Sequence, residues 1–261
     1  MADKVTVIQE NYSKNLKALD YAVVMDGVFK DAPDLLLATM KFMYNVIHSG
    51  RFKGTTLLEI GSGALVHNIA SASAIFPNIV MSDYVENNCE ELKRWLKGES
   101  PLKQFLDVPA ELEGYKEDLE AGKQFLENRI KQRVKQVVRC DVLKDNIFLE
   151  QLKPEVTPPY DLIISSLCLE AAAPDFDGFV LCLKRINKLL RPGGGLILVG
   201  FFQGKQWTVE KTDYHYIEIT ENDLRKALRE SGFGNLDLKI HDKFNVDYEH
   251  DKYYCLVAEK L

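Results

Sequence analysis

Three short segments carry the residue types that bind an adenosine-containing ligand. Gly61-Ser62-Gly63 follows an apolar run, and glycines let a ligand approach the backbone because they lack Cβ and accept positive φ. Asp83 and Asp141 are acidic residues that each follow a later apolar run. A carboxylate at the first position can accept hydrogen bonds from both ribose hydroxyls. At the second position it can accept from an adenine amino group, while Val142 packs on the ring.

Each feature also has an ordinary structural interpretation. A G-S-G triplet is a common turn, Asp83 could cap the next helix, and Asp141 could be a solvated turn residue. Their order favours a ligand site, because a glycine turn after the first strand is followed by acids after the second and third. Ligands of open α/β sheets bind at the carboxyl ends of the strands, where all three segments are expected.

The same region favours a ligand without phosphate over a dinucleotide. The dinucleotide fingerprint is G-x-G-x-x-G, and Val66 stands at its third glycine position. Glu59 lies just before the turn, where a carboxylate would repel a pyrophosphate. We therefore expect S-adenosyl-L-methionine as the cofactor and S-adenosyl-L-homocysteine as the product. An NAD-dependent oxidoreductase is the less favoured enzyme alternative.

The elements that must position these residues alternate between strands and helices. Strands are predicted at 56–60, 78–82, 134–139, 161–166, 196–199, 236–241 and 253–259. Helices are predicted at 66–75, 86–97, 177–190 and 220–231. This alternation predicts an α/β fold of the Rossmann-like, doubly wound type, with a mostly parallel seven-stranded sheet and one antiparallel edge strand.

Residues 1–50 are predicted to form a helical cap on a Rossmann-like core of residues 55–261. The first helix of this cap has apolar residues at helical spacing: Tyr12, Leu16, Leu19 and Val23. The second is predicted over residues 35–47, after Pro33 and before Gly50. Residues 98–131 are charged and helix-prone, which indicates a helical insertion before the third strand. A chain of 261 residues with 46% hydrophobic content suits a single domain.

Composition argues against several partners and compartments. A net charge of −6 without a basic patch argues against nucleic acid. The longest apolar run, 196–202, is far shorter than a membrane span, and the first ten residues lack the apolar region of a secretion signal. The five cysteines form no C-x-x-C motif and the histidines do not cluster, so we expect reduced thiols and no metal site. We expect a cytoplasmic monomer.

Longer motifs resemble one enzyme family. The chain is similar to the nicotinamide, phenylethanolamine and indolethylamine N-methyltransferases in L-L-E-I-G-S-G, I-V-M-S-D-Y with N-N after it, V-K-Q-V-V-R-C-D-V, S-S-L-C-L-E-A-A-A-P-D and L-L-R-P-G-G. The resemblance covers the chain from about Tyr12 to Leu261. It implies a single methyltransferase domain that transfers a methyl group from S-adenosylmethionine to the nitrogen of a small molecule by in-line displacement.

The resemblance also implies a set of cofactor contacts. Tyr12 and Tyr21 are expected to close over the methionine end of the cofactor. Asp83 with Tyr84 is expected to hold the ribose, and Ser166 to lie beside the sulfonium. The full predicted set is Tyr12, Tyr21, Gly61, Ser62, Gly63, His67, Asp83, Tyr84, Asn88, Asp141, Val142 and Ser166.

Glu170 is the predicted catalytic residue. It lies just past the fourth strand, and the phenylethanolamine type has Glu at this position while the nicotinamide type has Asp. A carboxylate there would bind the ammonium of an amine substrate and relay the proton that the amine must lose. A pyridine nitrogen needs no base. The alternative is that Glu170 only caps a helix.

Departures from the family pattern leave the substrate open between a nicotinamide-like pyridine and a small aromatic amine. Gly200 stands where the nicotinamide type has Asp, His67 replaces a common Tyr, and Asp26 falls where a further tyrosine is expected. The predicted substrate-binding residues are Gly200, Tyr214, His215, Tyr216 and Asp247. A non-catalytic protein that binds S-adenosylmethionine is the alternative from another class.

Overall fold

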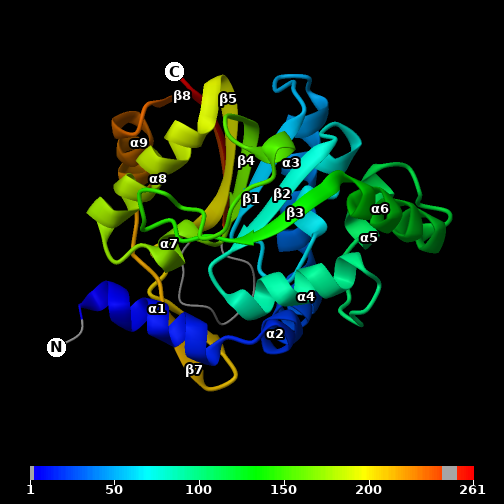
Figure 1. The fold of residues 1–261 in the computed structure, drawn as a ribbon, viewed down its shortest axis with the longest axis horizontal. Helices are drawn as coiled ribbons and strands as arrows, with labels where there is room; N and C mark the ends of the chain where they lie inside the picture. The colour runs from blue at the N-terminus through cyan, green and yellow to red at the C-terminus, as the bar shows by residue number, and fades with distance from the viewer. Residues whose placement is uncertain (1–2, 243–251) are drawn as a thin grey trace.

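The structure is a computed structural model that describes residues 3–242 and 252–261. Seven strands form one sheet in the order β3-β2-β1-β4-β5-β9-β8 (Figure 1). Their bounds are β1 Thr56–Ile60, β2 Asn78–Asp83, β3 Val134–Arg139, β4 Tyr160–Ser166, β5 Leu190–Phe202, β8 Phe233–Asp242 and β9 Lys252–Lys260. All seven predicted strands are present, and β5 extends beyond the predicted 196–199 at both ends.

The strand directions position the site. β1 pairs in parallel with β2 and β4, and the parallel arrangement continues to β3 on one side and β5 on the other. β9 is antiparallel to both β5 and β8, so the reversed strand lies one place in from the edge that β8 forms. The chain leaves β1 toward β2 and later returns to β4 on its other side. That reversal opens a crevice at the carboxyl ends of β1 and β4.

Helices cover both faces of the sheet, because alternate strand residues face opposite ways. Leu57 and Met81 pack in one apolar cluster with α3, α4 and α6, and Leu58 and Val80 pack in another with α8 and α9. The helices are α1 Lys4–Asn15, α2 Ala18–Asp31, α3 Pro33–His48, α4 Glu86–Leu96, α5 Asp107–Leu112, α6 Leu119–Arg133, α7 Leu169–Ala172, α8 Phe176–Leu189 and α9 Glu221–Glu230. None of these helices is long and apolar enough to cross a membrane, within the part of the chain described.

The N-terminal segment differs from the predicted two-helix cap. Leu16 and Lys17 have extended backbones and separate α1 from α2, so the apolar residues at helical spacing do not share one face. Leu19 and Val23 are exposed. α3 packs in the core against the sheet, and only α1 and α2 lie across the carboxyl edge (Figure 1).

The predicted helix at 66–75 is wrong. The chain forms two short 3-10 turns there, His67–Ile69 and Ala72–Ala74. The carbonyl of Ala70, which would accept the next α-helical bond, instead accepts from the Ser73 hydroxyl and from the Arg129 guanidinium at 3.0 Å. Side-chain donors therefore replace the backbone donor that would continue a helix.

α6 belongs to the charged segment predicted as an insertion, and it brings Arg129 to these turns. α5 and α6 lie together beyond β3, at one end of the sheet (Figure 1). The guanidinium of Arg129 also makes two parallel bonds to the Glu113 carboxylate, at 2.7 and 2.6 Å. Such a bidentate pair fixes the geometry of α6 against the loop after α5.

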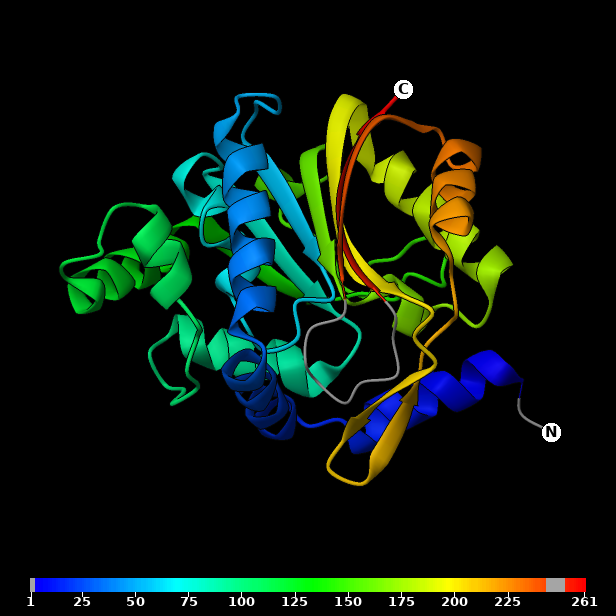
Figure 2. The same cartoon turned by 180° about the vertical axis from the view of Figure 1, so that it is seen from behind.

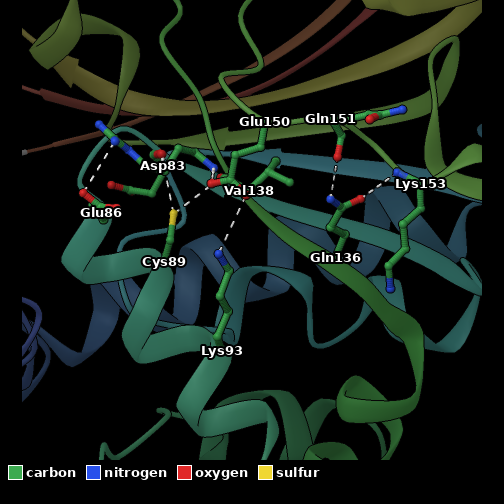
Figure 3. Close-up of polar contacts among 10 residues, drawn as sticks. Asp83, Glu86, Cys89, Lys93, Gln136, Val138, Glu150, Gln151 and Lys153 are labelled. Carbon is green, nitrogen blue, oxygen red and sulfur yellow. Dashed lines mark hydrogen bonds and ion pairs between the residues drawn. The ribbon is translucent and has the colours of Figure 1, made fainter.

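α4 is fastened to the ends of β2 and β3 (Figure 3). The Cys89 thiol points from α4 at the carbonyls of Asp83 and Val138, at 3.6 and 3.4 Å. Lys93 on the next turn pairs with Glu150 at 3.8 Å. These contacts hold the backbone of Asp83 where β2 ends.

A two-stranded hairpin, β6 Gln206–Val209 and β7 Thr212–His215, was not predicted. It leaves the main sheet after β5 and lies beside α1 (Figure 2). The Asn11 side chain of α1 donates to the Asp213 carbonyl at 2.9 Å. The hairpin and α1 thus meet across the carboxyl edge of the sheet, although they are some 200 residues apart.

Candidate active site

The larger cavity lies at the carboxyl ends of β1, β2, β3 and β4, under α1. Together with the open solvent at its mouth, it contains about 780 Å³ of space between atoms. Ten of the twelve predicted cofactor residues line it: Tyr12, Tyr21, Gly61, Gly63, Asp83, Tyr84, Asn88, Asp141, Val142 and Ser166. Residues from five separate segments therefore meet at one place.

The turn after β1 needs glycine at positions 61 and 63 because neighbouring side chains pack closely against its backbone. Gly61 and Gly63 have φ of 75° and 59°, a region that favours glycine. A Cβ on Gly61 would fall 2.3 Å from the Cys168 sulfur, and one on Gly63 would fall 2.5 Å from the Tyr21 ring. The turn thus lets α2 and the segment after β4 approach each other at the cavity floor.

Asp83 is buried and organises the cavity floor. It accepts from the Gly63 amide and the Val85 amide, each at 2.8 Å, and from the Asn88 side chain at 3.1 Å. Burial raises the pKa of Asp83, and these donors act in the opposite direction. An ionised carboxylate has about four acceptor sites, so roughly one is left for a ligand. Holding both ribose hydroxyls requires one internal donor to give way.

Asp141 connects β3 to α1. Its carboxylate accepts from the Leu143 amide at 2.9 Å and from the Gln9 side chain at 3.0 Å. Gln9 belongs to α1 and lines the cavity, yet the sequence analysis did not select it. No local pattern marks Gln9, because its contact depends on how α1 docks 132 positions away in the chain.

Aromatic side chains cover the cavity. The Trp207 indole N–H donates to the Tyr12 hydroxyl at 2.8 Å, and Tyr214 stacks on Trp207 with ring centroids 4.9 Å apart. Tyr21 meets Trp207 edge-on at 6.1 Å. Burial raises the pKa of Tyr12 and of Tyr21, so both remain neutral donors. Trp207 follows Gly200 among the aromatics expected near the pocket and is not in the predicted cofactor or substrate sets, yet it also lines the cavity.

Ser62 and His67 line a second, smaller cavity. It adjoins the first, because both share Tyr21, Gly61, Ser166 and Leu167. Burial lowers the pKa of His67 to about 4, and its Nδ1 has no hydrogen-bond partner in the described structure. Asp26, at the position where a tyrosine is expected, instead pairs with Lys30 and Lys103 and lines neither cavity.

Glu59 lies beneath the same turn. Its Oε2 accepts from the Ser62 hydroxyl at 2.8 Å, and its Oε1 has no partner among the described residues. Burial raises the pKa of Glu59 to about 7. Glu59 lines neither cavity, so its preference for a cofactor without phosphate stays a prediction.

Glu170 lies on α7 beside Ala171, which lines the larger cavity, but Glu170 itself lines neither cavity. It is fully buried, and its Oε1 is hydrogen-bonded to the Tyr254 hydroxyl of β9. Burial raises the pKa of Glu170 to about 7. Gly200 does not line a cavity either; a Cβ there would fall 2.0 Å from Glu170 Oε1. Its glycine makes room for this carboxylate.

Three other predicted substrate residues, Tyr214, His215 and Tyr216, lie on β7 or directly after it. Tyr214 contacts Tyr12, with ring centroids 4.8 Å apart. The His215 ring lies 3.2 Å from the Ala173 carbonyl, and Tyr216 is buried against Gly204. None of the three lines the larger cavity, and their contact with a substrate stays a prediction. Asp247 lies outside the described residues.

The fold and the site define a class. A doubly wound sheet with buried acids after β2 and β3 and no third glycine is the arrangement expected of an S-adenosylmethionine-dependent methyltransferase. The magnesium protoporphyrin IX methyltransferase of Synechocystis PCC 6803, solved with bound cofactor, superposes with a TM-score of 0.58 at 16% identity, covering 100% of this chain and 99% of that one. The 1,6-didemethyltoxoflavin-N1-methyltransferase of Burkholderia thailandensis gives 0.52 at 19% identity, over 93% and 88%.

The family is defined by sequence. Residues 10–261 match the NNMT/PNMT/TEMT family, and the chain belongs to it. Nicotinamide N-methyltransferase of Homo sapiens is 29% identical, over 87% of this chain and 85% of that protein. Phenylethanolamine N-methyltransferase of Mus musculus is 32% identical, over 77% and 68%. The protein is thus an S-adenosylmethionine-dependent N-methyltransferase by class, and the NAD-dependent oxidoreductase alternative is set aside.

Proposed function

We propose that the protein methylates the nitrogen of a small aromatic or arylalkyl amine, and that a nicotinamide-like pyridine is the alternative substrate. The observation that carries the proposal is a fully buried glutamate, Glu170, beside Ala171 of a cavity suited to S-adenosylmethionine. Relatives named for nicotinamide and for phenylethanolamine are about equally similar, so similarity alone does not choose between the two substrate types.

The cofactor is assigned to the larger cavity by the acceptors that line it. Asp83, Tyr84 and Asn88 are proposed to hold the ribose, and Asp141 with Val142 the adenine. The methionine end is assigned to the turn and to the smaller cavity, where Ser62 and His67 lie. When bound, S-adenosylmethionine supplies a methyl group on a positively charged sulfur. The chain's own contribution is positioning and the exclusion of water under α1, effects that can supply roughly 7–11 kcal/mol.

Glu170 is proposed to handle the proton of an amine substrate. An amine enters as an ammonium ion, whose N–H groups can donate a hydrogen bond to Glu170 Oε2. That oxygen has no other partner in the described structure. Transfer of one proton to Oε2 leaves the neutral amine with the lone pair that attacks the methyl group. A carboxyl group with a pKa near 7 is suited to this exchange at neutral pH.

Steady-state methylation assays with phenylethanolamine, tryptamine and nicotinamide test the proposal. We expect the amines to be methylated with higher kcat/KM than nicotinamide, and Glu170→Gln to lower the amine rates more than the nicotinamide rate. A much higher kcat/KM for nicotinamide would reject the amine substrate. Cofactor binding with no product from any of a broad panel of small amines and pyridines would favour the non-catalytic binding protein.

The cellular setting is part of the same proposal. All five cysteines are free thiols and four are buried, which fits a reducing compartment such as the cytoplasm. A monomer is the proposed state, and size-exclusion chromatography with light scattering tests it. The partner proposed is a small molecule and neither nucleic acid nor membrane, since the cavity under α1 is lined by acidic and aromatic side chains that suit a compact ligand.

A further inference from the structure

Tyr254 and Glu170 form a buried pair that nothing in the sequence motifs predicts. Tyr254 lies on β9 and Glu170 on α7, 84 positions apart, and both side chains are fully buried. The Tyr254 hydroxyl donates to Glu170 Oε1. Phe202 stacks on the Tyr254 ring with centroids 4.7 Å apart and fixes its plane. The hydroxyl is therefore held in one direction by the sheet.

Gly200 completes this arrangement. It faces Tyr254 directly across the β5–β9 ladder, so the two residues share a register position. A Cβ on Gly200 would fall 2.5 Å from the Tyr254 hydroxyl as well as 2.0 Å from Glu170 Oε1. Any larger residue would separate the pair. The absence of a side chain at position 200, first seen as a lost substrate contact, is a condition for the hydrogen bond.

The Tyr254 hydroxyl is the single side-chain donor to Glu170 among the described residues, and Oε2 of Glu170 has no hydrogen-bond partner there. Glu170 interacts electrostatically with three titratable groups: Cys168 before α7, Tyr216 after β7 and Tyr254 on β9. None of them is a cation. Burial raises the pKa of all three, so they are neutral. Among the described residues, no positive charge therefore helps to hold Glu170 ionised.

We propose that Tyr254 is a positioning residue, which holds Oε1 of Glu170, leaves Oε2 as the oxygen available to an amine substrate, and favours the carboxylate form. The inference rests on the proposed function of Glu170. Its physical basis is that a hydroxyl donating to a buried carboxylate stabilises the charged form over the neutral acid. An ionised Glu170 is needed to receive an ammonium and its proton.

Tyr254→Phe tests the inference, with Tyr160→Phe as the matched control. Tyr160 is also a fully buried strand tyrosine whose hydroxyl makes one hydrogen bond, to the Val156 carbonyl at 2.8 Å, and it lies at the amino end of the central strand β4. The carboxyl carbon of Glu170, labelled with ¹³C, is titrated by NMR in wild type and both variants, with Glu170→Gln assigning the signal. We expect Tyr254→Phe to move the midpoint alkaline by about one pH unit, since the lost bond is to a charged group.

The pH dependence of kcat/KM reports the ionisation of the same carboxyl group, that of Glu170. With phenylethanolamine, the acidic limb of kcat/KM should move with the NMR midpoint, so Tyr254→Phe loses about tenfold in kcat/KM below the limb and little above it. Glu170→Gln should remove the limb, and adding Tyr254→Phe to it should change nothing further.

An unchanged NMR midpoint in Tyr254→Phe, or an equal shift in Tyr160→Phe, overturns the inference. If the midpoint shifts but no amine is methylated by the wild type, the pairing stands and the proposed function fails. Unchanged binding of S-adenosylhomocysteine shows that each variant is folded.

Discussion

Asp83 is assigned both a binding role and a structural role, and a substitution there affects both. It is assigned to the ribose, and it also holds the Gly63 and Val85 amides in place. Asp83→Asn keeps an acceptor of the same size and removes the charge, so we expect weaker binding of S-adenosylhomocysteine by roughly tenfold or more from loss of one charge-assisted bond. Isothermal titration measures this.

The control is a carboxylate that also accepts from two backbone amides but lies at the amino end of β4, away from both cavities. Asp161 accepts from the Thr55 and Thr56 amides at 2.8 and 3.0 Å. Asp161→Asn should lower the unfolding midpoint and leave the cofactor Kd unchanged. Equal affinities in wild type and Asp83→Asn would show that the ribose lies elsewhere.

His67 gives the fold a dependence on pH. Its pKa in the folded state is about 4, below the ordinary 6.5, because of burial. Between these values the unfolded chain binds a proton that the folded chain does not, so stability falls as pH is lowered. The loss between pH 7 and pH 5 is about 2 kcal/mol. Urea unfolding should show His67→Gln losing less stability than wild type over this interval.

Glu59 acts in the opposite direction over the same interval. Burial raises its pKa to about 7, so the folded chain binds its proton first and the fold gains stability as pH falls. This contribution is common to wild type and His67→Gln and cancels in the difference. Identical pH dependence in the two proteins would show that the His67 ring is not buried in the neutral form.

Among the helices, α1 covers the larger cavity, so a ligand that enters there must pass this helix. It is held by Gln9 to Asp141 on one side and by Tyr12 to Trp207 on the other. Gln9→Ala removes a bond to a carboxylate worth roughly 1.5–3 kcal/mol. Amide hydrogen exchange in α1 should therefore become about tenfold faster or more.

Lys14→Ala is the matched control on the same helix. Lys14 forms an exposed pair with Glu10 at 2.8 Å, and such pairs contribute about 0.3–0.5 kcal/mol. Its effect on exchange should be slight. If Gln9→Ala and Lys14→Ala exchange alike, the contact between Gln9 and Asp141 does not hold α1.

The strands were predictable because each is a short apolar run between turn residues, and Asp83 and Asp141 follow from where those runs end. The failures have a different origin. The 3-10 turns at 67–74 depend on Arg129, and the position of Trp207 depends on a hairpin that docks on α1. Gln9 and Tyr254 reach the site only through tertiary contacts. Periodicity along the chain carries no information about such partners.

For the molecule as a whole, ligand binding should appear as added stability. S-adenosylhomocysteine at a hundred times its Kd adds about 2.7 kcal/mol, which corresponds to a rise of about 5–10 °C in Tm for a chain of this size. Differential scanning fluorimetry measures it. NADH, tested at the same concentration, should produce no rise, because Val66 stands where the dinucleotide fingerprint has its third glycine. The reverse pattern would contradict the cofactor assignment.

The docking of α1 has a consequence for the pace of the reaction. Under the proposed function, substrate enters and both products leave beneath this helix, so hydrogen bonds such as Gln9 to Asp141 and Trp207 to Tyr12 must break and re-form in every catalytic cycle. The same contacts that keep water from the reacting groups also slow the release of the methylated product and of S-adenosylhomocysteine. We therefore expect the opening of α1 to limit turnover as much as the transfer of the methyl group does.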